Sequence, residues 1–237
     1  KVGITSNSHK AINNLLSQIE DLAEEENFTF KGLKKSSKEE QRLNGKIIED
    51  VSGRMKEFPK DYLLHAGTAW LFSDPRYDLK MDYLFVDEAG QVALANTLAI
   101  ATSTKNIILI GDQMQLANPG QGTHPENSGD SCLDYLLQGS PTIPVDTGVL
   151  LPDTYRMHSQ ICNFISSRIY ENRITSIDSN DNRAINHPSK SSHQKSFGIE
   201  YIPVEHIGNE QASLEEALKI KEIIKSLLVS TKIDRDG

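Results

Sequence analysis

The stretch Leu84-Phe85-Val86-Asp87-Glu88-Ala89-Gly90-Gln91 joins an apolar run to an acidic pair. A short apolar run of this kind is typical of a parallel strand that is covered on both faces. In an open parallel sheet, functional groups gather at the carboxyl ends of the strands, where Asp87 and Glu88 stand. Asp87 could hold Mg²⁺, and Glu88 could orient or deprotonate a water that attacks a γ-phosphate. An isolated Asp-Glu pair is also a common start of an ordinary surface loop.

A second strand-end motif follows, in which Ile107-Ile108-Leu109-Ile110 leads into Gly111-Asp112-Gln113-Met114-Gln115-Leu116. Gly111 permits a tight exit from the strand. Asp112 and Gln115 then lie where a second loop could sense a phosphate. Taken alone, the motif is explained as well by a polar turn. Two such motifs on consecutive predicted strands, with a helix-length stretch between them, argue against a chance occurrence.

A third apolar run, Val2-Gly3-Ile4, precedes a helical pattern of apolar residues at i, i+3, i+4 and i+7 spacing. The residues in this pattern are Ile12, Leu15, Leu16, Ile19 and Leu22. Ser6, Asn7 and Ser8 are residue types that cap helix starts. Strand, polar turn and helix together predict one βα unit, and the three runs together predict an α/β fold with a parallel sheet.

Residues 24–60 are charged and poor in large apolar residues. The preferred interpretation is a solvated helix or loop inserted into the domain. A basic arm that contacts a nucleic-acid strand is the alternative, and it is disfavoured because acidic residues are interleaved with the lysines. Trp70 is left without a functional role, because a tryptophan is more often core than a base-stacking platform.

Pro141, Pro144 and Gly148 break the chain before a new unit near Leu150, so we expect one domain at 1–149 and another at 150–237. In the second domain, residues 198–204 are predicted as a strand. An amphipathic helix is predicted to follow at residues 214–228.

The 237 residues, with 37% hydrophobic and 24% charged content, suit a globular protein. The net charge of −8 argues mildly against coating nucleic acid by bulk electrostatics, but not against gripping a strand in a narrow groove. No apolar run approaches the ~20 residues that cross a bilayer, so no membrane association is expected. Cys132 and Cys162 form no metal-binding pair and predict a reduced, intracellular protein, cytoplasmic, or nuclear in a eukaryote.

Five stretches, in this order, resemble the motifs of superfamily 1 helicases, and the last has the form typical of the 1B branch. That branch includes the RNA-surveillance helicase and the replication helicase-nuclease. The stretches are Thr5–Leu15 (motif Ia), Gly67-Thr68-Ala69 (motif Ic), Asp87–Gln91 (motif II), Gly111–Leu116 (motif III) and Thr154-Tyr155-Arg156-Met157-His158 (motif IV). The resemblance implies a RecA-like P-loop NTPase sheet flanked by helices, incomplete here, followed by the start of a second RecA-like domain.

The resemblance also implies roles in the hydrolysis of ATP with Mg²⁺. Asp87 would bind the metal, Glu88 would be the catalytic base, and Asp112 would belong to the nucleotide site. Gln91 and Gln115 would contact the γ-phosphate or the attacking water. Tyr155 would stack on the nucleotide base, and Arg156 would be an arginine finger. Two structural alternatives stay open: Tyr155 could be core, and Arg156 could pair with Asp153 or Glu171.

Ser6, Asn7 and Thr68 would contact the sugar-phosphate of single-stranded DNA or RNA, along which the protein would move 5′-to-3′. Ser6 and Asn7 could equally be helix caps. His158 is expected to have a structural role. The resemblance leaves open a non-translocating P-loop ATPase, a degenerate binding module, and a fused nuclease or other domain in the parent protein.

The departure from the family's pattern is the absence of a Gly-x-x-x-x-Gly-Lys-[Ser/Thr] run and of motifs V and VI from these 237 residues. We therefore expect a piece of a longer protein that lacks the first strand and the phosphate-binding loop. By itself the piece is expected to bind ATP feebly and to hydrolyse almost none.

Overall fold

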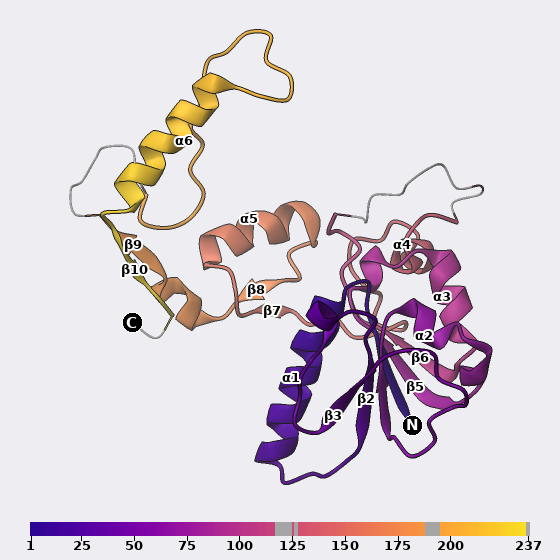
Figure 1. Cartoon of the computed structure of the whole chain (residues 1–237). Coiled ribbons are helices and arrows are strands. Elements are labelled where there is room, and N and C mark those ends of the chain that lie inside the picture. The colour runs from indigo at the N-terminus through magenta and orange to yellow at the C-terminus, as the bar shows by residue number, and fades with distance from the viewer. Residues whose placement is uncertain (117–124, 126–127, 188–194, 236–237) are drawn as a thin grey trace. The chain divides into compact units, whose positions relative to one another are not determined.

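The computed structural model describes residues 1–116, 125, 128–187 and 195–235, and Figure 1 shows its elements. The chain divides into two compact units, Lys1–Ser140 and Pro141–Gly237. The division falls ahead of residue 149, where the sequence predicts that the first domain ends.

Unit 1 is built on a six-stranded sheet with the strand order β3-β2-β4-β1-β5-β6. Every pair of neighbouring strands is parallel, which confirms the predicted α/β fold and is consistent with a RecA-like sheet. The three apolar runs of the sequence are β1, β5 and β6, and β1 pairs directly with β5. The strands are β1 (Val2–Thr5), β2 (Gly32–Lys35), β3 (Ile48–Val51), β4 (Leu64–Ala66), β5 (Met81–Val86) and β6 (Thr104–Leu109).

Helices cover both faces of this sheet (Figure 1). Helix α1 packs on one face through buried Ile12 and Leu16, and the Ser8 hydroxyl caps its start by accepting a first-turn backbone N–H. Helices α2, α3 and α4 contribute to a second core on the other face, together with Leu84 and Val86 of β5. The helices are α1 (His9–Glu25), α2 (Ala69–Phe72), α3 (Leu94–Ala101) and α4 (Cys132–Leu137), with short 3-10 turns η1 (Glu39–Gln41), η2 (Pro75–Tyr77) and η3 (Ala89–Gln91).

The prediction that residues 24–60 form a solvated helix or loop is wrong. The segment supplies β2 and β3, which complete one side of the sheet. Lys34 of β2 is fully buried, and its Nζ donates to Ser36 Oγ at 3.1 Å and lies 4.0 Å from Asp50 Oδ1. A lysine can occupy this buried strand position because polar groups from other parts of the segment satisfy it. The local sequence does not display that pairing, so its charge suggests a solvated segment.

We expect unit 1 to lose stability between pH 6.5 and pH 4 because of His65. The imidazole is fully buried on β4, where Nδ1 lies 3.2 Å from Tyr77 Oη and Nε2 lies 3.2 Å from the Tyr62 carbonyl oxygen. Burial lowers the pKa of His65 from 6.5 to about 4. Between these two pH values, His65 therefore takes up a proton in the unfolded chain but stays neutral in the folded chain. Stability is full above pH 6.5 and falls by up to about 3 kcal/mol as the pH approaches 4.

The measurement is the free energy of unfolding in urea across this pH range, for the unmodified chain and for His65→Gln. The glutamine does not titrate, so the variant should show a flatter curve, with a smaller slope left by His9, whose pKa burial also lowers. Asp74 and Asp82 have pKa values of about 2, so their loss of stabilisation falls mainly at more acidic pH. Equal slopes for the two proteins would contradict the assignment to His65.

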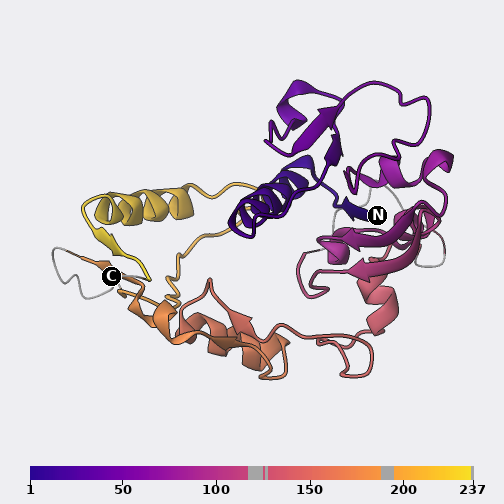
Figure 2. The ribbon, with the colours of Figure 1, turned by 90° about the horizontal axis from the view of Figure 1, so that it is seen from below.

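The described residues of unit 2 form two α-helices and two small sheets, one parallel (β7–β8) and one antiparallel (β9–β10). Helix α6 confirms the predicted amphipathic helix, but none of its residues is buried, and it lies apart from α5 in Figures 1 and 2. The elements are β7 (Asp153–Thr154), α5 (Ser159–Ile169), β8 (Thr175–Ser176), η5 (Asp178–Asn182), β9 (Ala184–Asn186), α6 (Leu214–Leu227) and β10 (Thr231–Ile233). That unit 2 begins a second RecA-like domain stays a prediction.

The predicted strand at residues 198–204 is wrong, because that stretch is irregular. Gly198 has a left-handed backbone with φ +90°. Pro203 lacks the N–H that a ladder needs, and no described strand pairs with the stretch. An apolar run becomes a strand only where a neighbour satisfies its backbone groups.

Cys132 and Cys162 are buried and unpaired. Within the described residues, every helix is too short or too polar to span a bilayer.

Candidate nucleotide and nucleic-acid site

The candidate residues of unit 1 lie at one edge of the sheet, because the carboxyl ends of parallel strands meet there. The strand order divides this edge in two. The β5–β6 side holds the acidic loops, and the side from β1 to β3 holds the residues predicted to contact nucleic acid. Ser6 and Asn7 follow β1, Thr68 follows β4, Asp87, Glu88 and Gln91 follow β5, and Asp112 and Gln115 follow β6.

The loop after β5 turns sharply at the acidic pair. Asp87 N donates to the Thr5 carbonyl oxygen at 2.9 Å, which continues the pairing with β1. Glu88 has a left-handed backbone with φ +54° and ψ +41°. A glutamate in this region costs about 1–3 kcal/mol, and such residues cluster at functional sites. The turn η3 follows at once, with Gln91 N donating to the Glu88 carbonyl oxygen at 2.8 Å.

Two glycines allow the loops after β5 and β6 to touch. A Cβ built on Gly111 would lie 2.7 Å from Ala89 N, and one on Gly90 would collide with the Asp112 carbonyl oxygen. In the same contact, Ala89 N donates to the Ile110 carbonyl oxygen at 2.8 Å. The φ of Gly111 lies outside the left-handed region, so close approach is what requires a glycine there.

We expect Gly90→Ala to destabilise unit 1 by about 1–3 kcal/mol, because the new methyl group meets backbone that cannot move aside cheaply. Chemical denaturation gives the difference. Gly148→Ala is the control, since a Cβ there meets only the flexible Ile143 side chain. A Gly90→Ala protein as stable as Gly148→Ala would show that the loops separate without cost.

The loop after β6 is organised around Asp112. Its Oδ1 accepts from Met114 N at 2.9 Å, and its Oδ2 accepts from Gln115 Nε2 at 3.2 Å. Asp112 therefore holds the turn, and it also fixes the amide of Gln115, one of the predicted phosphate sensors.

The loop after β1 faces both halves of the edge. Ser8 is the helix cap, so the capping alternative is wrong for Ser6 and Asn7. Asn7 Nδ2 instead donates to the Gln91 carbonyl oxygen at 2.5 Å, joining this loop to the loop after β5. Ser6 is buried, and its Oγ has no hydrogen-bond partner within the described structure. An unsatisfied buried hydroxyl beside the start of a helix is suited to receiving a phosphate oxygen.

A cavity of about 480 Å³ opens on the side from β1 to β3, and Ser6, Asn7 and Thr68 all line it. Thr68 stands at the start of α2, but its hydroxyl makes no capping hydrogen bond. The structure thus brings together the three residues predicted to contact nucleic acid.

Three basic residues, Lys35, Arg54 and Arg76, line the same cavity with one acidic residue, Asp74. Lys35 belongs to the lysines of the disfavoured basic arm, whereas Arg54 and Arg76 were not predicted from the sequence. Arg76 Nε donates to Asp74 Oδ1 at 2.7 Å, and this hydrogen bond holds the pKa of Asp74 at about 2. Burial, and then the charge of Arg76, lower the pKa of Lys35. The Ile47-Ile48 pair was the available signal for a strand leading to Arg54, but the surrounding charges obscured it.

Trp70 also lines this cavity, and 87% of its surface is exposed. The expectation that it belongs to the core is wrong. Helix α2 turns Leu71 and Phe72 into the core, which leaves the indole on the outside.

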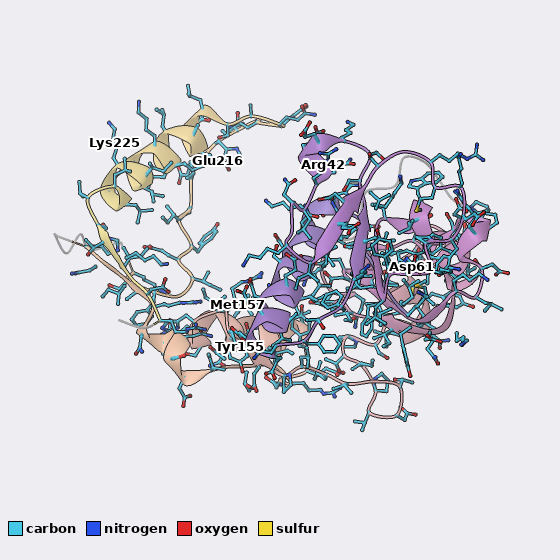
Figure 3. All side chains as sticks on the ribbon, turned by 60° about the horizontal axis from the view of Figure 1, so that its bottom comes forward. Arg42, Asp61, Tyr155, Met157, Glu216 and Lys225 are labelled. Atoms are coloured by element: carbon cyan, nitrogen blue, oxygen red, sulfur yellow. The ribbon has the colours of Figure 1, made fainter. Side chains whose placement is uncertain are left out.

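In unit 2, Tyr155, which is labelled in Figure 3, comes between β7 and α5 in the chain. It is 64% exposed, so the alternative that it is core is wrong. The Arg156 guanidinium has no hydrogen-bond or ion-pair partner among the described residues. Its suggested partners are engaged elsewhere: Asp153 accepts from Thr175 Oγ1 at 3.0 Å, and Glu171 accepts from Thr142 Oγ1 at 2.7 Å.

His158 is structural, as expected. Its Nδ1 accepts from Gln160 N at 3.2 Å at the start of α5. Its ring stacks on Phe197 with the centroids 4.7 Å apart.

The described residues contain no cluster of three or more histidine, cysteine or acidic side chains that could cage a metal ion. Mg²⁺ in nucleotide enzymes is commonly held by one or two carboxylates together with substrate phosphates and water. Asp87, at the carboxyl end of β5, fits that kind of site.

No family model matches the chain. It is 30% identical over 127 residues to a Mus musculus protein named "Probable helicase with zinc finger domain", covering 48% of this chain and 6% of that protein. The Homo sapiens protein of that name is 29% identical over the same length. "Probable helicase MAGATAMA 3" of Arabidopsis thaliana is 32% identical over 110 residues, 46% of this chain and 13% of that protein. The chain thus spans a small part of these relatives, and the likeness supports a helicase-like function.

Proposed function

We propose that the chain is part of a superfamily 1B helicase that couples ATP hydrolysis to movement along single-stranded DNA or RNA, 5′-to-3′. The observation that carries the proposal is the Asn7–Gln91 hydrogen bond at the shared edge of the sheet. It joins the cavity that holds Ser6 and Thr68 to the loop that holds Asp87 and Glu88. Similarity to proteins named as probable helicases supports the same conclusion.

In the hydrolysis half, Asp87 would hold Mg²⁺, which would offset charge on the phosphates of ATP. Glu88 accepts a proton from the attacking water. Gln91 and Gln115 contact that water or the γ-phosphate, and Asp112 keeps Gln115 in place. The left-handed backbone of Glu88 is of a kind that clusters at functional sites, which supports a catalytic role.

Unit 2 contains two further residues with proposed roles toward the nucleotide. Tyr155 stacks on the nucleotide base, and Arg156 extends its guanidinium to the phosphates during hydrolysis. The exposure of Tyr155 and the unpaired Arg156 side chain support these roles. They also favour a motor with two RecA-like domains over a non-translocating ATPase.

In the nucleic-acid half, Ser6, Asn7 and Thr68 bind backbone phosphates without reading the sequence. Because Asn7 also holds the Gln91 carbonyl, a strand that pulls on Asn7 shifts the residue that faces the γ-phosphate. Strand binding and hydrolysis are coupled through this one side chain.

Binding of a fluorescently labelled 12-nucleotide strand to this chain tests the cavity, by anisotropy over a range of salt concentrations. We expect binding at low salt, with log K falling against log salt at a slope of about −0.7 for each phosphate contacted. Ser6→Ala combined with Thr68→Val should weaken binding, while Thr102→Val, an exposed threonine after α3, should not. No binding at low salt, or equal binding by both variants, would overturn the assignment.

ATP turnover and polarity need a protein that carries this chain together with a phosphate-binding loop. Strand displacement should start from a 5′ overhang and not from a 3′ overhang. The present chain alone is expected to hydrolyse ATP only at background.

A further inference from the structure

Trp70 has a surface that its own fold does not use. The indole is 87% exposed, whereas Leu71 and Phe72 beside it are buried and anchor α2 to the core. The ring is thus held by a rigid element while remaining open to a ligand. It forms part of the wall of the cavity of about 480 Å³ that also holds Ser6 and Thr68.

The charge around this ring favours an anion. Lys35, Arg54 and Arg76 line the cavity against the single carboxylate of Asp74. Asp74 is paired with Arg76, and the charge of the exposed Arg54 also acts on it, so three cationic side chains face one carboxylate. Basic side chains gathered in one place, on a chain of net charge −8, mark a local site for a negatively charged ligand.

The buried Ser6 hydroxyl adds a third, independent feature, because Ser6 is one of the residues that line the cavity and its Oγ has no hydrogen-bond partner among the described residues. The cavity therefore offers a polar hydroxyl, unneutralised cationic charge and a flat aromatic ring. A free phosphate would use the first two and leave the ring idle. An apolar protein segment would use the ring and leave the cations unsatisfied.

We propose that Trp70 is a stacking platform for one base of a single strand whose phosphates lie against Arg54 and Lys35. The inference rests on the proposed function and adds to it a contact with the base. Stacking on an aromatic ring beside a basic groove holds a strand without reading its sequence, because every base has a flat face. The platform should therefore accept DNA and RNA of any sequence.

Trp70 is the single tryptophan of the chain, so its fluorescence reports on this site alone. The experiment titrates the unmodified chain with a 12-nucleotide thymidine strand and with an abasic strand of the same length and charge. We expect the thymidine strand to quench the fluorescence and to bind about tenfold more tightly than the abasic strand. Equal quenching and equal affinity for the two strands would overturn the proposal.

Variants provide a second readout, by anisotropy of the labelled thymidine strand. Trp70→Ala should lose about tenfold in affinity, and Trp70→Phe, which keeps a stacking face, should recover most of it. Leu98→Ala, an exposed apolar residue of α3 that is not among the residues lining the cavity, is the matched control and should bind normally. Because the Trp70 indole is 87% exposed, its replacement should disturb the fold little. Circular dichroism of each variant verifies that the fold is retained.

The two proposals fail in different ways. If neither strand binds at low salt, the nucleic-acid role of the cavity fails, and the platform fails with it. If both strands bind equally and Trp70→Ala binds like the unmodified chain, only the platform is excluded.

Discussion

Replacing Arg156 by alanine should reduce ATP turnover by about 10³-fold or more, with little change in nucleotide affinity. An arginine finger acts on charge that develops in the transition state, and its removal costs about 10³–10⁵ in rate. In this chain the Arg156 guanidinium has no described partner, while Asp153 and Glu171 bond to threonines. The side chain is therefore available to a nucleotide without first breaking an ion pair.

The measurement is single-turnover ATP hydrolysis, in a protein that contains this chain and a phosphate-binding loop. Arg156→Lys keeps the charge but loses the planar guanidinium, and most of the activity should be lost with it. Arg168→Ala is the control. Arg168 is an exposed arginine of the neighbouring helix α5, and its replacement removes the same charge. Activity within tenfold of the unmodified protein for Arg156→Ala would reject the finger.

Replacing Glu88 by glutamine should lower turnover by about 10²–10⁴-fold and leave ATP binding intact. The glutamine has the same shape but cannot accept the proton of the attacking water. Glu88 has a left-handed backbone immediately before η3, and the isosteric change should leave the direction of its side chain unchanged. The effect should lie in the chemical step and not in folding.

Binding of a fluorescent nucleotide and single-turnover hydrolysis separate these two effects. Glu25→Gln, at an exposed position of α1, is the matched control and should leave both unchanged. Asp87→Asn should instead weaken Mg²⁺-dependent nucleotide binding. Turnover that survives in Glu88→Gln would mean that another group accepts the proton.

Binding of a strand in the cavity of unit 1 should also affect ATP hydrolysis at the loop after β5. Asn7 lines the cavity and holds the Gln91 carbonyl, so it belongs to both halves. Stimulation of hydrolysis by a strand should therefore depend on Asn7 more than basal hydrolysis does.

The sequence alone determined the elements whose signals are local. The runs that became β1, β5 and β6 are apolar on both faces, and the spacing of Ile12 and Leu16 makes one side of a helix. The spacing of apolar residues and the local composition are enough to predict such elements, because each element's pattern lies within its own residues. The placement of Asp87 and Asp112 at one edge follows from parallel strands and needed no further information.

Features that depend on partners distant in sequence emerged from the packing of the folded chain. Lys34 is buried in β2 because Ser36 and Asp50 satisfy it, so a charged segment became part of the sheet. The exposure of Trp70 and the Asn7–Gln91 bond likewise depend on how separate loops meet. Residues 198–204 carry a strand's apolar content without a partner strand, and they remained irregular. Burial and hydrogen bonding belong to pairs of segments, and for that reason the packing decides them.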